Sequence, residues 1–290
     1  MPQSDVSPTR RKLLIISLLS SILATLGKAR ASEPRFPDIS AFRERVIARI
    51  KQLPDLDEVT PDPADPAKID IRIKDNVITS DVTNIFGYLN SYPNENADEI
   101  IDRFVRSLTA FQTPVSHEQL VAAIRTAALL QEIEASGQSV LHQRLVGDLV
   151  IALMVDLPDS LRWAIEDDFP NESFDDLQPI AFENLREWLP KVAPNRISDT
   201  VVQYLVEGND ILAPGMILLD EFWQLAKSDF PGDVLVTIAR RDQLIVFEAS
   251  NPAALRAARS IVDDTFEEGF MLLSNRIYRR RDGKLELVEE

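Results

Sequence analysis

The stretch Gly232–Phe266, GDVLVTIARRDQLIVFEASNPAALRAARSIVDDTF, decides the fold of this chain. Two apolar runs lie on either side of the polar triplet Arg240-Arg241-Asp242. β-rich runs of this length around a polar break predict two antiparallel strands. Asn251-Pro252 then supplies a helix cap followed by proline at the first helical position. Apolar residues at helical spacing from Leu255 to Phe266 predict a helix that covers the hairpin.

Similar patterns recur along the chain. Strand pairs alternate with helices but lack regular βαβ spacing, so we predict an α+β fold with mixed or antiparallel sheets built from strand pairs covered by amphipathic helices. Residues 60–68 carry three prolines and predict an extended connector, whereas 201–206 fit either a strand or a helix. The predicted helices span 42–53, 81–88, 97–111, 116–135, 173–189 and 216–226; the predicted strands span 69–73, 77–78, 149–155, 161–165 and a tail hairpin over 276–288.

The first residues have the three-part pattern of a secretory signal. Basic Arg10-Arg11-Lys12 precedes the apolar segment Leu13–Leu26, and Ala29-Arg30-Ala31 is a small-x-small cleavage site. The apolar segment is shorter than the roughly 20 residues that span a bilayer, so we expect cleavage and no stable membrane span afterwards. We therefore expect an exported protein, periplasmic or extracellular. The paired arginines fit twin-arginine export, and the general secretory route stays open.

Composition narrows the function classes. The chain of 290 residues has a formal net charge of −16 and no cysteine. Negative charge of this size disfavours nucleic acid as a partner, and the missing cysteines exclude disulfides and thiol catalysis. We predict a signal segment at 1–31, an N-terminal α+β subdomain at 32–115, and a core with a C-terminal hairpin–helix unit at 116–290.

Common catalytic motifs are not found in the sequence. It lacks GxSxG, GxGxxG, P-loop and HExxH patterns. Its two histidines, His117 and His142, do not suffice for a multi-histidine metal site, so we expect structural roles for both and predict no metal and no cofactor. Acidic pairs such as Asp167-Asp168 could do acid–base chemistry, but they also suit helix starts.

Basic residues stand out because the chain is acidic. Arg240 and Arg241 lie at the predicted hairpin turn, and a second basic group follows in 276–284. If the two hairpins adjoin, these side chains could form a cationic patch suited to carboxylate or phosphate groups. The alternative is that each arginine pairs with a neighbouring acid.

Several segments resemble a bacterial family, the YtpQ-like family. They are GDLVIALMVDLPDSLRWAIEDDF (147–169), AFENL (181–185), LLDEFW (218–223), VTIARRDQLIVFE (236–248) and LLSNRIYRRRDGK (272–284). The resemblance implies a shared fold from about residue 42 onward and carries no activity with it. It also implies that the recurrent polar positions of the family fall here on Asp156, Asn184, Arg241, Asp242 and Ser274, which are the candidate binding residues.

The sequence therefore predicts an exported, non-catalytic protein that binds a protein partner or a small anionic ligand through the Arg241 hairpin region. The alternative is a hydrolase of the cell envelope that uses Asp156, Asp242 or another carboxylate, with or without a divalent cation. Whether the protein is an enzyme stays open. A pocket in which Asp156, Asn184, Arg241 and Asp242 converge would favour the hydrolase.

Overall fold

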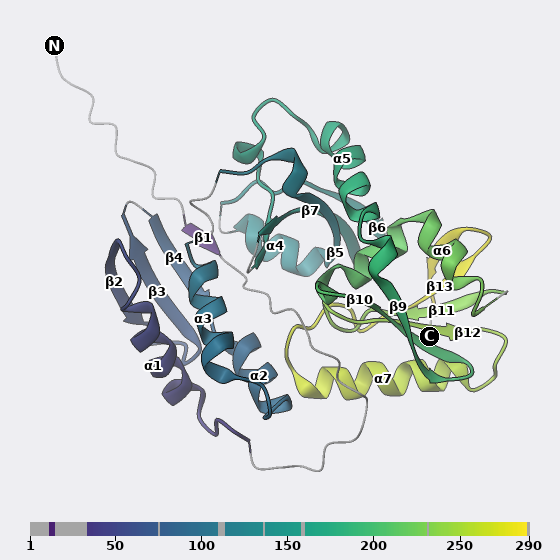
Figure 1. Ribbon diagram of the computed structural model, residues 1–290, viewed down its shortest axis with the longest axis horizontal. Helices are drawn as coiled ribbons and strands as arrows, with labels where there is room; N and C mark the ends of the chain where they lie inside the picture. Colours follow the sequence, from purple (N-terminus) through teal and green to yellow (C-terminus); the bar gives the residue numbers. More distant parts are fainter. Residues whose placement is uncertain are drawn as a thin grey trace.

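The first layer of the molecule is a small sheet with helices on one face (Figure 1). The computed structural model describes residues 12–14, 34–74, 76–109, 114–135, 137–157, 160–230 and 232–288. The sheet order is β1-β4-β3-β2. Its strands are β1 (Lys12–Leu14), β2 (Leu56–Pro61), β3 (Lys68–Ile73) and β4 (Asn76–Asp81); its helices are α1 (Ile39–Ile50), α2 (Thr83–Ser91) and α3 (Ala97–Ser107). We call this unit the N-terminal layer.

Sequence patterns explain the layer. Ile69, Ile71 and Ile73 of β3 are buried under the helices while the residues between them are more exposed, as the alternation predicts. β2 includes the first two residues of the predicted connector 60–68, so that prediction was partly wrong: Thr60 and Pro61 pair with β3 on its outer side. Proline is tolerated there because β2 is an edge strand.

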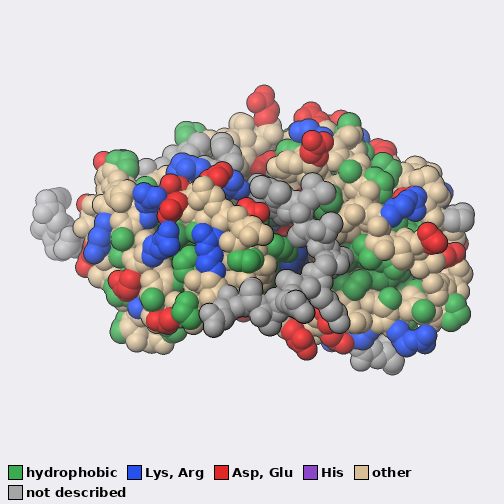
Figure 2. All heavy atoms as spheres, turned by 60° about the horizontal axis from the view of Figure 1, so that its bottom comes forward, with side chains coloured by type: hydrophobic (Ala, Val, Ile, Leu, Met, Phe, Trp, Pro, Cys, Tyr) green, Lys and Arg blue, Asp and Glu red, His purple; other side chains and the backbone are tan. Residues whose placement is uncertain are grey.

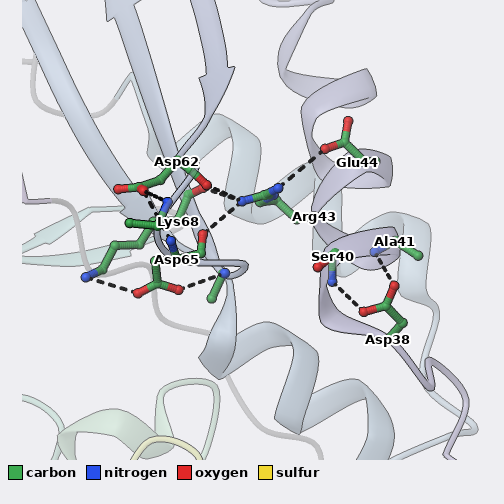
Figure 3. Close-up of polar contacts among 10 residues, drawn as sticks. Asp38, Ser40, Ala41, Arg43, Glu44, Asp62, Asp65 and Lys68 are labelled. Carbon is green, nitrogen blue, oxygen red and sulfur yellow. Dashed lines mark hydrogen bonds and ion pairs between the residues drawn. The ribbon is translucent and has the colours of Figure 1, made fainter.

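Polar contacts at the end of the layer hold α1 on the loop after β2 (Figure 3). Asp38 caps α1 and accepts hydrogen bonds from the backbone N–H groups of Ser40 and Ala41. Arg43 Nη1 donates to the carbonyl oxygens of Asp62 and Asp65 at 3.0 and 2.9 Å. The proline-rich loop is therefore tied to a helix, although its residues form no regular structure.

The second sheet is built around the apolar strand β7. Its order is β5-β7-β6, with β8 pairing beside β6 on the same side of β7. β7 was predicted as a central strand, and it is buried along nearly its whole length. The elements are η2 (His117–Gln119), β5 (Leu120–Thr126), α4 (Ala127–Ala135), β6 (His142–Val146), β7 (Leu149–Leu157), β8 (Ser160–Trp163), η3 (Glu166–Asp168), α5 (Phe174–Arg186) and η4 (Leu189–Lys191).

The predicted helix over 116–135 was wrong in its first half. The capping box of Ser116 and Gln119 exists, but it closes only the short turn η2. β5 follows and pairs with β7 along its full length, from Leu120 to Thr126. Its run LVAAI is buried on both faces, and burial between layers overrides the local preference for helix.

The third sheet has six antiparallel strands in the order β14-β13-β11-β12-β10-β9, and α7 lies along one face of it (Figure 1). The predicted central hairpin, its covering helix and the tail hairpin are confirmed. Asp282 and Gly283 both have positive φ, 49° and 78°, as a two-residue turn of this kind requires. The elements are β9 (Val192–Ser198), β10 (Val201–Val206), η5 (Asp210–Leu218), α6 (Asp220–Ala226), β11 (Val234–Thr237), β12 (Leu244–Glu248), α7 (Ala254–Glu268), β13 (Ile277–Arg281) and β14 (Lys284–Leu287).

The structure resolves one open prediction in this region and differs from two others. The undecided segment 201–206 is the strand β10, paired on both sides. The predicted helix 216–226 is split, because η5 runs to Leu218 and α6 begins only at Asp220. α7 begins at Ala254, two residues after Pro252, although Asn251 Oδ1 does accept a hydrogen bond from Ala253 N–H at 2.9 Å.

The N-terminal layer joins the rest of the molecule through α2. Asn84 Oδ1 accepts a hydrogen bond from Met271 N–H at 2.8 Å, and the Tyr88 ring meets Phe270 edge-on. Gly87 lies so close to Phe270 that an added Cβ would be 2.6 Å from the Phe270 Cβ. Most buried apolar side chains form one cluster to which all three sheets contribute, and a second, smaller cluster lies between the third sheet and α7. The α+β fold predicted from the sequence is therefore present, with three sheets sharing a core.

The predicted signal segment can be compared with the structure at only one place. Apart from β1, which pairs in parallel with β4, residues 1–31 lie outside the described residues. Cleavage after Ala31 would remove β1 and leave β4 as the edge of its sheet. Within the described ranges, no helix has the length and apolar content needed to cross a bilayer. Signal cleavage and export stay predictions.

Candidate functional site

The turn between β11 and β12 carries two arginines in very different surroundings. Arg240 is fully engaged: its Nε donates to Asp242 Oδ1 at 3.1 Å and its Nη1 to Glu268 Oε2 at 2.9 Å. Nη1 also lies 3.4 Å from the Tyr92 hydroxyl, and the guanidinium lies over the Phe270 ring. Burial alone would lower the pKa of Arg240, but the charge of Asp242 and the contact with Tyr92 outweigh it and raise the pKa.

Arg241 is just as buried but has no such partners. Its side chain retains 8% exposure, and its Nε is buried without a hydrogen bond. Across the described residues, the Arg241 guanidinium makes neither a hydrogen bond nor an ion pair. Burial lowers the pKa of Arg241 to about 10, and the charge of Glu132 on α4 only partly opposes this. The carboxylate of Glu132 is exposed to solvent and lies beyond ion-pair distance.

Arg125 on β5 is a second buried cation. It is 1% exposed, and it donates through Nη1 to the carbonyl oxygen of the neighbouring Ile124 at 2.7 Å. Its Nη2 is buried without a partner. Burial, together with the positive charge of Arg241, lowers the pKa of Arg125 to about 9. The two guanidinium groups therefore repel each other, and neither makes an ion pair with a carboxylate of the described residues; we call them the arginine pair.

Backbone and side-chain contacts bring the two arginines together. Segment 271–274 runs beside 238–241, with Arg241 N–H donating to Met271 O and Ser274 N–H to Ile238 O. Ser274 Oγ then donates to the Asp148 carboxylate at 2.9 Å. Asp148 is at the turn before β7, and its carbonyl accepts from Ala127 N–H, two residues after Arg125. The C-terminal end of β5 is thus fastened to the hairpin turn.

Ser274 has a structural role in this connection. Besides Asp148 it contacts the Tyr278 hydroxyl at 2.8 Å, and Tyr278 itself donates to the Asp148 carboxylate. The hydroxyl groups of Ser274 and Tyr278 therefore both have partners within the protein. Burial, followed by the bond to Asp148, raises the pKa of Tyr278. The network couples the second sheet to the third, and it leaves the arginine pair without an acceptor.

The five predicted site residues form two separate groups. Arg241, Asp242 and Ser274 lie at the hairpin turn and the start of β7. Asp156 lies near the other end of the nine-residue β7, roughly 25 Å away for a strand that rises about 3.4 Å per residue. Asn184 is at that end as well, because it donates to the carbonyl oxygens of His117 and Leu120 at 2.6 and 2.8 Å. The convergence that would favour a hydrolase is therefore not observed.

The other predicted site residues, Asn184, Asp242 and Asp156, each contact neighbouring groups of the protein. Asn184 fastens α5 to the start of β5, and Asp242 is held by Arg240. Asp156 has one weak polar contact, with Asn209 Nδ2 at 3.5 Å, and its burial raises its pKa to about 6 against the effect of that contact. Among the described residues, no cluster of three acidic or histidine side chains is arranged to hold a metal ion.

The two predicted hairpins adjoin, since β11 pairs with β13, but two of the tail arginines lie far from the β11–β12 turn. Arg280 and Arg281 lie opposite Val234 and Asp233, at the far end of β11 from Arg240. Arg281 pairs with Asp233 at 2.7 Å, and Arg280 lies over the Trp223 ring. On the face shown in Figure 2, basic side chains over the N-terminal layer alternate with acidic ones, as on a solvated surface. Arg281 is thus paired with an acid, in contrast to Arg241.

The two histidines lie near one shallow cleft. His142 lines it together with Phe169 and Glu172, and His117 Nε2 is 3.0 Å from both carboxylate oxygens of Glu172. His142 Nδ1 is 3.1 Å from the Val140 carbonyl oxygen. Both rings thus have protein partners, as structural histidines do.

Sequence reasoning missed Arg125 because the segment 116–135 was predicted to be helical. On a helix, a single arginine after LVAAI would reach solvent; on a strand buried on both faces it cannot. The available signal was the lone charge in the apolar run LVAAIRTAALL. No family model, curated protein or solved structure matches this chain. The resemblance to the YtpQ-like family stays a prediction.

Proposed function

We propose that this protein is an exported, non-catalytic binding protein that holds a small anion at the arginine pair. The observation that carries the proposal is a buried Arg241 with no acceptor among the described residues, beside a second buried arginine. An uncompensated charge in a protein interior costs several kcal/mol. A bound anion would offset this cost through charge-assisted hydrogen bonds.

Burial favours a small ligand over a protein partner. Arg125 and Arg241 are 1% and 8% exposed, so the surface of another protein has little access to either guanidinium. Arginine also suits the task chemically, because its planar fork donates two parallel hydrogen bonds to carboxylate or phosphate oxygens. The small anionic ligand is therefore the better supported of the two partner classes expected from the sequence.

The carboxylate-dependent hydrolase has less support. Its acidic residues are far apart, and Asp242 is already paired with Arg240. Burial raises the pKa of Asp156 to about 6, as a general acid needs, but burial raises the pKa of Glu268 as well, so the shift alone does not mark a catalytic group. Within the described residues, Asp156 hydrogen-bonds only to Asn209 and to no second carboxyl group.

Anion-dependent stabilisation tests the proposal. We would follow thermal unfolding of the full chain in phosphate, sulfate or formate, with sodium chloride added to hold the ionic strength constant. A ligand that binds only the folded state raises the free energy of unfolding by mass action, by about 2.7 kcal/mol at a hundred times its Kd, and the melting temperature rises with it. Arg241→Met should lose this effect, and Arg256→Met, at an exposed position on α7, should keep it.

Two results would overturn the proposal. One is a wild-type melting temperature that no anion changes beyond the chloride control. The other is an Arg241→Met variant that responds to anions as the wild type does, since the effect would then arise elsewhere on the surface.

A further inference from the structure

The geometry points to a doubly charged tetrahedral oxyanion of the phosphate or sulfate type as the ligand, bound by Arg125 and Arg241 together. This inference rests on the proposed function and adds the charge and shape of the ligand and the role of Arg125. It begins from unused donors. Arg125 Nη2 and Arg241 Nε are both buried without a partner, although Arg125 lies on β5 of the second sheet and Arg241 in the turn between β11 and β12 of the third.

The charge count favours a dianion. Two guanidinium groups contribute two positive charges, and no carboxylate within the described residues is in contact with either. A monoanion would neutralise one charge and leave the other buried and uncompensated. A dianion neutralises both. Because electrostatic interactions are stronger away from water, this difference should be large at a buried site.

The donor arrangement favours a tetrahedral group. A guanidinium fork presents a pair of N–H groups that matches two oxygens of one ligand. A phosphate- or sulfate-type group has enough oxygens to accept from two forks at once, whereas a single carboxylate group has two. One small tetrahedral ion can therefore satisfy donors from both arginines.

The two arginines also differ in position. Arg241 keeps 8% of its surface accessible and Arg125 only 1%, so Arg241 is the outer member and Arg125 the inner member. An arriving anion would meet Arg241 first. The burial of Arg125 limits the ligand to a free ion or to the terminal group of a small ester, because a bulky substituent would have to point outward past Arg241.

Calorimetric titration of the full chain at constant ionic strength tests the inference. The dianion probes are sulfate, inorganic phosphate and methyl phosphate, and the monoanion probes are nitrate and formate. We expect the dianions to bind at least tenfold more tightly than the monoanions. Phosphate affinity should rise as the pH passes through neutrality, where the dianion forms, while sulfate affinity stays constant. Inorganic phosphate and methyl phosphate distinguish a free ion from the end of an ester.

Variants test whether both arginines touch one ion. Arg125→Met and Arg241→Met should each weaken sulfate binding at least tenfold, and the double variant should lose less than the product of the two single losses. Arg125→Lys keeps the charge without the fork and should also bind at least tenfold more weakly. It serves as the test if Arg125→Met does not fold.

The outcomes distinguish a failure of the proposed function from a failure of the dianion inference alone. If no anion binds, both the proposed function and this inference fail. If anions bind but nitrate matches sulfate, the inference fails and the proposed function stands. The same holds if the folded Arg125 variants bind sulfate as the wild type does, because Arg241 would then act alone.

Discussion

Arg240 and Arg241 are adjacent in the sequence and equally buried, but they have opposite surroundings. Arg240 faces the N-terminal layer, where Asp242, Glu268 and Tyr92 surround its guanidinium. Arg241 instead interacts electrostatically with the exposed Glu132 on α4 and with the cation Arg125 on β5, and it makes an ion pair with neither. Burial lowers the pKa of Arg241, whereas the partners of Arg240 raise its pKa despite burial.

The difference separates two uses of a buried arginine. At Arg240 the protein provides its own anions, and the cation connects two parts of the fold. At Arg241 the guanidinium offers hydrogen-bond donors, but none of the described residues accepts from them. Stability alone would not favour the second arrangement, since natural proteins pay for such groups mainly at functional sites. Removing the two cations should therefore change stability in opposite directions.

The largest expected effect is at Arg240. Arg240→Met would leave Asp242 buried without its partner and remove the contacts to Glu268 and Tyr92. Breaking a buried ion pair from one side costs about 3–5 kcal/mol, so the free energy of unfolding should fall by that amount in urea titrations. Arg256→Met on the surface of α7 is the matched control and should change it by less than about 0.5 kcal/mol. A similarly small loss for Arg240→Met would remove the contrast.

Arg241→Met should have the opposite sign. Replacing an unpaired buried cation by an apolar side chain of similar length removes a desolvation cost, and exchanges of buried charge for apolar groups are often neutral or stabilise by about 1–4 kcal/mol. We expect a higher free energy of unfolding than in the wild type when chloride is the only anion. In sulfate the difference should shrink, because only the wild type gains binding energy. Destabilisation of the variant in chloride would mean that Arg241 has a structural role.

Asp156 is an acidic counterpart to Arg241: a partly buried carboxyl group that makes no ion pair among the described residues. Burial raises its folded pKa from 3.8 to about 6, so folding favours the protonated form. The folded state therefore carries almost no penalty from Asp156 below about pH 4, and the free energy of unfolding falls as the pH rises toward 6. The full penalty above that pH corresponds to roughly 2–3 kcal/mol.

Asp156→Asn should remove this pH dependence. Urea titrations should give equal unfolding free energies for the variant and the wild type at pH 4, and a more stable variant at pH 7.5, by up to roughly 2 kcal/mol. Asp167→Asn is a control on the exposed turn η3. A difference that is the same at both pH values would show that Asp156 does not titrate in this window.

Much of the fold could be predicted because its patterns are local. The central hairpin, α7, β7 and the tail hairpin follow from apolar runs and turn residues that act within a few positions. β5 could not, since LVAAIRT forms a strand only because β7 and the layers on each side bury it. The edge strands β2, β6 and β9 have weak apolar patterns, so they too are set by their neighbours.

The candidate site was predictable in part for the same reason. Arg240-Arg241 at a turn is visible in the sequence, but which arginine is paired depends on Tyr92 and Glu268, which come from other elements. Arg125 depends on the strand that was missed. Ser274 and Asn184 were singled out by resemblance, and the structure shows both making hydrogen bonds within the protein. Sequence patterns locate charged residues; their partners come from the tertiary fold.

The smallest expected effect concerns the packing behind Arg240. Gly87→Ala would place a Cβ 2.6 Å from the Phe270 Cβ, against the ring that lies under the Arg240 guanidinium. Glycine to alanine inside a helix normally stabilises by about 0.5–1 kcal/mol, whereas overpacking costs about 1–3 kcal/mol. We expect a net loss of roughly 1–2 kcal/mol in urea titrations. Gly232→Ala, where an added Cβ meets no atom within 4 Å, is the control and should lose nothing comparable.

Combining Gly87→Ala with each arginine variant tests the contrast itself. Phe270 contacts both Gly87 and Arg240, so Gly87→Ala and Arg240→Met should be non-additive by at least about 0.5 kcal/mol. Arg241 interacts electrostatically with Glu132 on α4 and shares no described partner with Gly87, so Gly87→Ala and Arg241→Met should add within about 0.5 kcal/mol. Equal coupling in the two pairs would show that the turn responds as one unit. The two arginines could then not be assigned separate roles.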